Sequence, residues 1–293
     1  FDPCLISRAR MGIAKVHVQS HNPEQASDAL TRASSGLLAC SASNRLELTL
    51  LASDLWLSLQ KEEKSSAILR REIKVQPDQL ALHSRLAKIA FISGDWNSSR
   101  EAIRFCLSNT ESETTKEQTT EWLSYLIQLD IIENRSTSDS IVASFHSIST
   151  QIAWETAQDH RQQIFTLLTL QGKELLAFEW SQLILDFTPT EESKSLAQAH
   201  LQIAQSANRA NRPLDAVIGF HEAIKAARAS NDPTLLTHTL RAKAIFEEKR
   251  SNYIAALASM FEVDSIQSAL FQGLSAFESR QNRRFQEQVL PEP

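Results

Sequence analysis

Residues 82–107 read LHSRLAKIAFISGDWNSSREAIRFCL. In the first half, Leu86 and Ile89 fall on one face of a helix, because residues three or four apart share a side. Gly94 then interrupts the helical pattern, and apolar residues return at helical spacing around Ile103. This pattern predicts a helix, a short turn and a second helix that runs antiparallel to the first.

The composition of the whole chain favours helices over sheets. Only 6 of the 293 residues are glycine and 8 are proline, whereas 42% are hydrophobic. Tight sheet turns and phosphate-binding loops both depend on glycine, so their scarcity here indicates helices joined by short polar connections. The hydrophobic content is sufficient for a buried core.

The arrangement of residues 82–107 recurs along the chain. A small residue begins the second helix of each unit, at Ala26, Ser65, Ser99, Ala177, Ala216 and Ala256. The intervals are 39, 34, 78, 39 and 40 residues. Because 78 is twice 39, the spacing predicts one more unit, with helices at about 119–133 and 138–150. Seven units then cover nearly the whole chain.

These units resemble the tetratricopeptide repeat family. Leu86 and Ala87 match the large-small pair of its first helix, residues 94–96 match its Gly-Asp-aromatic turn, and Ser99 occupies its small position. The resemblance implies an all-α solenoid of about seven antiparallel helix pairs in a right-handed superhelix. Most units exceed the family's usual length of about 34 residues. In this they are similar to repeats of bacterial signalling proteins, such as the sensor arms of transcriptional activators.

The end of the chain has a different pattern. We expect the repeat domain to span residues 1–265, a further helix residues 266–288, and a polar tail residues 289–293. Four apolar residues of that helix recur at helical spacing, namely Ile266, Leu270, Leu274 and Phe277. A solenoid needs a helix that covers its last apolar face, so we interpret this helix as a cap. The alternative is a coiled-coil connector to a domain beyond residue 293.

The three cysteines suggest neither a disulfide framework nor a metal site. Cys4, Cys40 and Cys106 are odd in number and widely spaced. We therefore expect buried, reduced thiols and a cytoplasmic location. No apolar run approaches the roughly 18 residues of a membrane helix, and this predicts that the chain has no membrane partner.

No motif for catalysis or cofactor binding is present. His221 and Glu222 open like a zinc protease helix, but Lys225 stands where that motif needs a second histidine. Neither glycine-rich nucleotide-binding motif occurs, and no nucleophile elbow occurs. We therefore predict no enzyme activity, no metal and no cofactor. The net charge of -5 comes from interspersed acidic and basic residues, which argues against a nucleic-acid partner.

The surface then has to carry the function. The resemblance places the first helix of each pair on a concave groove, and the candidate partner-binding residues are Arg8, Lys15, Arg85, Lys88, Phe91, Gln162, Gln205, Asn208, Arg241 and Glu248. This polar lining suits an extended peptide. Some family members clamp a peptide carboxylate, but here only Arg85 fits that pattern, and Met11 and Ala81 do not.

The sequence predicts a protein-interaction scaffold, with the sensor arm of a signalling protein as one form of it. Two alternatives remain open. A structural subunit of an assembly would expose a contiguous apolar patch outside the groove. A small-ligand sensor would close an apolar pocket around its ligand. No feature of the sequence indicates an oligomeric state.

Overall fold

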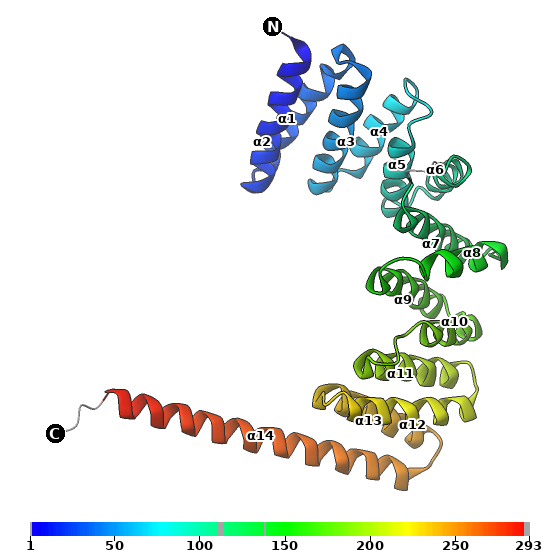
Figure 1. Cartoon of the computed structure of the whole chain (residues 1–293), viewed down its shortest axis with the longest axis vertical. Helices are drawn as coiled ribbons and strands as arrows, with labels where there is room; N and C mark the ends of the chain where they lie inside the picture. Colours follow the sequence, from blue (N-terminus) through cyan, green and yellow to red (C-terminus); the bar gives the residue numbers. More distant parts are fainter. Residues whose placement is uncertain (1, 111–113, 138, 290–293) are drawn as a thin grey trace. The chain divides into compact units, whose positions relative to one another are not determined.

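The computed structural model describes residues 2–110, 114–137 and 139–289, and side chains as far as residue 272. These residues contain helices and no strand (Figure 1). The α-helices are α1 (Pro3–Gln19), α2 (Pro23–Ser35), α3 (Ala42–Ser58), α4 (Glu62–Ile73), α5 (Leu80–Ile92), α6 (Trp96–Ser108), α7 (Lys116–Ile132), α8 (Asp139–Ser149), α9 (Trp154–Leu170), α10 (Glu174–Asp186), α11 (Ser193–Arg209), α12 (Pro213–Ala229), α13 (Pro233–Lys249) and α14 (Tyr253–Val289). A 3-10 helix, η1 (Leu37–Ala39), follows α2.

The helices form seven consecutive pairs, which confirms the all-α solenoid. The turn inside each pair contains one residue with a positive φ, and these are His21, Gln60, Gly94, Asn134, Gly172, Asn211 and Ser251. They follow one another at 39, 34, 40, 38, 39 and 40 residues. A residue in the left-handed region ends a helix and satisfies its last carbonyls. The handedness of the superhelix stays a prediction.

The fourth pair, which spacing alone had predicted, is present. The expected helices at about 119–133 and 138–150 correspond to α7 and α8, and residue 138 lies outside the described residues. Asn134 makes the turn at φ 54°. Asparagine can replace the family's glycine at this turn because it also tolerates the left-handed region.

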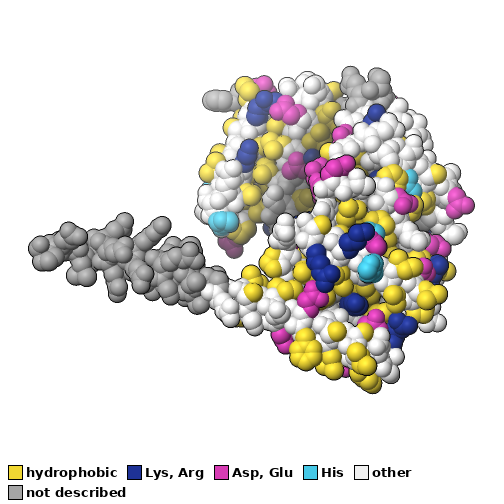
Figure 2. All heavy atoms as spheres, turned by 60° about the horizontal axis from the view of Figure 1, so that its bottom comes forward, with side chains coloured by type: hydrophobic (Ala, Val, Ile, Leu, Met, Phe, Trp, Pro, Cys, Tyr) yellow, Lys and Arg dark blue, Asp and Glu magenta, His cyan; other side chains and the backbone are white. Residues whose placement is uncertain are grey.

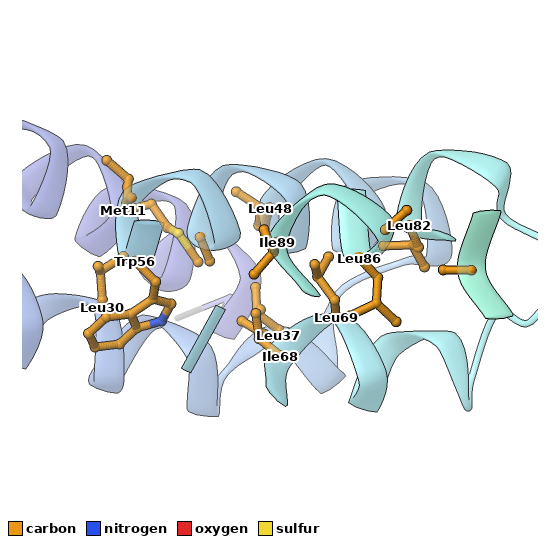
Figure 3. Close-up of a cluster of buried hydrophobic side chains, with 14 of the residues drawn as sticks. Met11, Leu30, Leu37, Leu48, Trp56, Ile68, Leu69, Leu82, Leu86 and Ile89 are labelled. Carbon is orange, nitrogen blue, oxygen red and sulfur yellow. The ribbon is translucent and has the colours of Figure 1, made fainter. Parts of the chain in front are cut away.

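The chain divides into two compact units, residues 1–160 (unit 1) and 161–293 (unit 2). The core of unit 1 runs continuously from α1 to α7. Figure 3 shows Met11, Leu30 and Trp56 gathered at one end of this core, and Leu69 and Leu86 farther along it. All five side chains are at most 7% exposed.

The small residues at the start of the second helices allow the helices to approach closely. Ala26, Ser65 and Ser99 are fully buried. The Ser99 hydroxyl donates a hydrogen bond to the Ala87 carbonyl across the pair, at 2.9 Å. A buried hydroxyl needs such a partner, so serine replaces the family's alanine here without an unsatisfied group.

Unit 2 packs a similar core with a closer helix approach. Phe178, Phe220 and Phe246 are buried together with alanines of α11 and α12. A Cβ atom added at Gly219 would lie 2.9 Å from the Ala204 backbone. The α11–α12 contact therefore depends on the absence of a side chain at this position.

A disulfide joins Cys4 to Cys40, so the prediction that these two cysteines are reduced thiols is wrong. α2 runs back along α1, and the chain after η1 therefore returns to the start of α1. The two Cα atoms lie 5.0 Å apart, within the range that a disulfide requires. Cys106 is a free, buried thiol, as predicted, and burial raises its pKa to about 12.

The last helix is longer than the sequence indicated. α14 is continuous from Tyr253 to Val289, so the expected boundary between residues 265 and 266 falls inside a helix. Its first half packs on the solenoid, where Val263 is buried against Ile224 and Leu240. The side chains of Leu274 and Phe277 lie outside the described residues. A cap or a connector role for α14 stays a proposal.

By length and composition, residues Tyr253–Gln272 of α14 could cross a membrane. In the solenoid, 17% of this stretch is buried. A mostly buried core helix of a soluble protein passes the same test, but this stretch is mostly exposed, and Glu262 and Asp264 lie near its middle. The absence of a membrane partner stays a prediction.

Candidate functional site

All ten candidate residues lie on the first helix of a pair. Arg8 and Lys15 are on α1, and the other candidates are Arg85, Lys88 and Phe91 on α5, Gln162 on α9, Gln205 and Asn208 on α11, and Arg241 and Glu248 on α13. In unit 1 the first helices α1, α3, α5 and α7 contact one another in sequence. Their shared side is called the first-helix face, and it comprises Arg8, Glu47, Asp54, Arg85, Lys88, Phe91, Glu121 and Tyr125.

Ion pairs connect each first helix of unit 1 to the next. Arg8 on α1 pairs with Glu47 on α3, with 2.9 Å between Nη2 and Oε2. Arg85 Nη2 on α5 donates a hydrogen bond to Asp54 Oδ2 on α3 at 3.2 Å, and Arg85 Nη1 lies 3.1 Å from Asp54 Oδ1. In the second pair both Nη atoms of Arg85 lie close to the Asp54 carboxylate.

The next connection combines an ion pair with stacked rings. Lys88 Nζ lies 3.5 Å from Glu121 Oε1 on α7, and the Tyr125 hydroxyl donates to the same oxygen at 2.9 Å. The Tyr125 ring stacks on Phe91, with 4.7 Å between the centroids. Burial and the nearby Glu121 carboxylate raise the pKa of Tyr125. Tyr125 therefore stays neutral and keeps its donor proton.

His160, at the end of unit 1, belongs to the same electrostatic surroundings. Burial lowers the pKa of His160, and Lys88 lowers it further, although Glu121 and Asp159 raise it. The ring is consequently neutral at pH 7. It can accept or donate a hydrogen bond there without adding charge to the face.

The ion pairs of the first-helix face are easily exchanged. Their side chains are between 29% and 63% exposed, and a pair in that setting contributes about 0–1 kcal/mol. Each pair nevertheless orients its two side chains between neighbouring first helices. A ligand that replaces one partner would therefore lose little stability and would meet side chains that are already ordered.

Sequence reasoning did not find the carboxylates and the tyrosine of this face. Glu47, Asp54, Glu121 and Tyr125 come from helices α3 and α7, where no groove residue was proposed in advance. Their partners are 31 to 39 residues away in the chain. The repeat period could have indicated them, since first helices one repeat apart are neighbours.

The candidates of unit 2 have different surroundings. Gln162 on α9 accepts a hydrogen bond from the Gln202 amide on α11, at 2.5 Å. Gln205 and Asn208 are half-buried, whereas Arg241 is exposed. These residues therefore do not belong to the ion pairs that connect the first helices of unit 1.

The described residues contain no group of three or more histidine, cysteine or acidic side chains that could hold a metal ion. His221 is 78% exposed and lies 4.0 Å from Glu222. His221 is therefore a residue of the helix surface.

Two solved structures share this architecture. The apo form of RapI aligns with 89% of this chain and 76% of its own, at a TM-score of 0.52 and 14% identity. The fold is tetratricopeptide-like. A signal-transduction ATPase with numerous domains and a tetratricopeptide repeat sensor, from Pyrococcus horikoshii, aligns with 92% of this chain and 43% of its own, at a TM-score of 0.50 and 14% identity. No family model matches the sequence, and a search of curated proteins finds no match. At such identities the likeness extends to the tetratricopeptide-like fold alone.

Proposed function

We propose that the chain is a protein-interaction scaffold that holds an extended peptide segment of a partner protein on the first-helix face of unit 1. The observation that carries this proposal is the contiguous set of Arg85, Lys88 and Phe91 on α5. Two cations and an aromatic ring stand there side by side at helical spacing, each already oriented by a neighbouring helix.

Each part of the face suits a different part of a peptide. The guanidinium of Arg85 and the ammonium of Lys88 can donate to backbone carbonyls or acidic side chains. The stacked rings of Phe91 and Tyr125 form a flat apolar surface for one side chain of the ligand. Glu121 can accept a backbone N–H. A peptide held in this way would be read by alternating polar and apolar contacts.

The sensor or regulatory arm of a signalling protein is the form of scaffold that we favour. The repeat lengths of 34 to 40 residues support it, because they resemble those of signalling proteins. The similar ATPase has a tetratricopeptide repeat sensor. A partner peptide would then act as the signal that the chain detects.

Charge reversal on the face tests the proposal. Peptides selected from a displayed random library against the wild-type chain would serve as the probe. The double variant Arg85→Glu, Lys88→Glu should bind them about tenfold more weakly, since it places like charges beside Asp54 and Glu121. Fluorescence anisotropy measures the affinity, and circular dichroism checks the helicity.

The matched control is Arg104→Glu with Lys74→Glu, which makes the same charge change at exposed positions on α6 and after α4. The control should bind the selected peptides as the wild type does. If both double variants bind equally well, the first-helix face is not the binding site.

A second candidate function, a structural subunit of an assembly, is favoured by α14. Ile254, Leu257 and Phe261 are 85%, 57% and 70% exposed on one side of this helix. Apolar residues gathered in this way mark contact surfaces. The variant Phe261→Asp should abolish any self-association seen by light scattering, whereas Leu214→Asp, at an equally exposed position of α12, should not. If light scattering gives the same molar mass in solution for both variants, α14 is not the contact surface.

The cytoplasmic location stays a prediction, and the Cys4–Cys40 disulfide argues against it. Structural disulfides persist in oxidising compartments and are rare where thiols are kept reduced. We favour an oxidising compartment for this reason. Thiol quantification on protein isolated without reductant would decide between the two locations.

A further inference from the structure

A pocket lies between the second helices of the last two pairs, on α12 and α14, and is called the α12–α14 pocket. It has a volume of about 660 Å³. Ile224 on α12, Leu240 on α13 and Ser259 on α14 are each at most 7% exposed and form its floor. A volume of this size accommodates a ligand or a large side chain.

The rim of the pocket is basic. Lys225 and Arg228 stand on α12 and Lys243 on α13. Figure 2 shows Lys and Arg side chains gathered with a histidine on the face of unit 2 beside the start of α14. The whole chain has a net charge of -5, so this concentration of positive charge runs against the average of the surface.

Two of the three cations are engaged by acids, and one faces the pocket without such a pair. Arg228 bridges to Glu262 on α14 at 2.7 Å, and Lys225 lies 3.4 Å from Glu222. Among the described side chains, no carboxylate forms an ion pair with Lys243. Lys243 is half-buried, where an unpaired ammonium group gains most from an incoming anion.

We propose that the α12–α14 pocket binds an acidic peptide segment of a partner protein. An apolar side chain of the segment rests on Ile224 and Leu240, and acidic side chains meet Lys243 and Lys225. The site is formed by α12, α13 and α14 of unit 2. It is therefore separate from the first-helix face of unit 1, and either site can exist without the other.

The arrangement fits a peptide better than a single small anion. His221 and Arg228 bound the α12 wall seven positions apart, which corresponds to about 10 Å along a helix. A wall of that length accommodates successive side chains of a peptide, whereas one carboxylate or phosphate would occupy only part of it. The apolar floor also gives a free anion nothing to contact.

The corresponding groove between α2 and α4 in unit 1 shows a contrast. Its floor is Trp56, and the Lys64 ammonium lies 4.6 Å from the centre of that ring. Arg71 donates to the Ser34 carbonyl at 3.1 Å. The cations of this groove are thus already bound by a ring and a carbonyl, which selects the α12–α14 pocket as the site open to an acidic ligand.

The probe for this proposal is a short fluorescent peptide that alternates glutamate and leucine, and the readout is anisotropy with the full chain. We expect saturable binding that weakens as salt is added, since the contacts are ionic. Lys243→Glu should lower the affinity about tenfold or more. Lys249→Glu, at an exposed position on the same helix, should leave the affinity within about twofold.

Three further measurements complete the test. Lys243→Met removes the charge without adding an acid, and it should weaken binding even if Lys243→Glu fails to fold. A peptide with glutamine in place of glutamate should bind poorly. Inorganic phosphate or free glutamate should not displace the peptide.

The proposal is overturned if the wild type does not bind the peptide, or if Lys243→Met and Lys249→Glu behave alike. Displacement by phosphate alone would mean a simple anion site. Equal binding of the glutamine peptide would mean that charge plays no part. The double variant Arg85→Glu, Lys88→Glu, which changes only the first-helix face, should still bind the glutamate–leucine peptide. The two proposals can therefore be rejected independently.

Discussion

Two glycines lie inside helices but have opposite surroundings. Gly219 on α12 faces the backbone of α11, and an added Cβ would lie 2.9 Å from the Cα and N atoms of Ala204. Gly12 on α1 has no atom within 4 Å of the same point. Glycine costs a helix conformational entropy at either place, but only Gly219 is required by packing.

Replacing each glycine by alanine should therefore change stability in opposite directions. Gly219→Ala should lower the free energy of unfolding by about 1–3 kcal/mol, because backbone cannot move aside as a flexible side chain can. Gly12→Ala should raise it by about 0.5–1 kcal/mol. Urea denaturation followed by circular dichroism measures both. A shift of the same sign in the two variants would contradict this account of Gly219.

At the scale of elements, one buried cation holds two helices of neighbouring pairs together. Arg100 on α6 is 7% exposed and pairs with Asp130 at 2.7 Å and with Glu133 at 2.5 Å, at the end of α7. Burial lowers the pKa of Arg100, but the two carboxylates raise it by more. The guanidinium therefore stays charged between two acids that have little access to water.

Removing that cation should destabilise unit 1 strongly. Arg100→Ala leaves Asp130 buried without a counter-charge and leaves Glu133 with Arg135 alone, which costs about 3–5 kcal/mol. Arg104→Ala, at an exposed position of the same helix, should change the free energy of unfolding by less than about 0.5 kcal/mol. Thermal melting of the two variants would show the difference, and similar melting temperatures would refute it.

At the scale of the whole molecule, the chain has separate cores in its two units. The core of unit 1 extends from Cys4 to Leu129, and the clusters of unit 2 lie between Phe178 and Val263. Solenoid stability is a sum of local terms, since each repeat contacts only its neighbours. A change within one unit should therefore affect mainly the unfolding of that unit.

The disulfide allows this to be tested. Cys4→Ser should lower the stability of unit 1 by about 4 kcal/mol, because the bond closes a chain segment of 36 residues. The unfolding of unit 2 should be unchanged. Hydrogen exchange read by mass spectrometry separates the two units, and added reductant should reproduce the effect on the wild type. Equal loss of protection in both units would show that they unfold together.

The repeat organisation follows from signals close together in the chain. Each turn, from His21 to Ser251, contains a residue in the left-handed backbone conformation, and in most pairs a small residue follows five positions later. Both signals lie within a single helix pair. Such signals do not depend on distant contacts. This explains why six of the seven pairs and the placement of all ten candidates on first helices could be predicted, whereas the fourth pair was predictable from the repeat spacing alone.

Only the tertiary structure decided which residues meet. The sequence predicts Cys4 and Cys40 as separate thiols, does not indicate Asp54 or Tyr125, and predicts a boundary at residue 265 inside α14. The disulfide and the ion pair join residues 31 or more positions apart, so they depend on how one helix lies against the next. The length of α14 depends on the absence of a turn near residue 265. Sequence periodicity determines the helices and their order, whereas packing determines the disulfide, the ion pairs and the α12–α14 pocket.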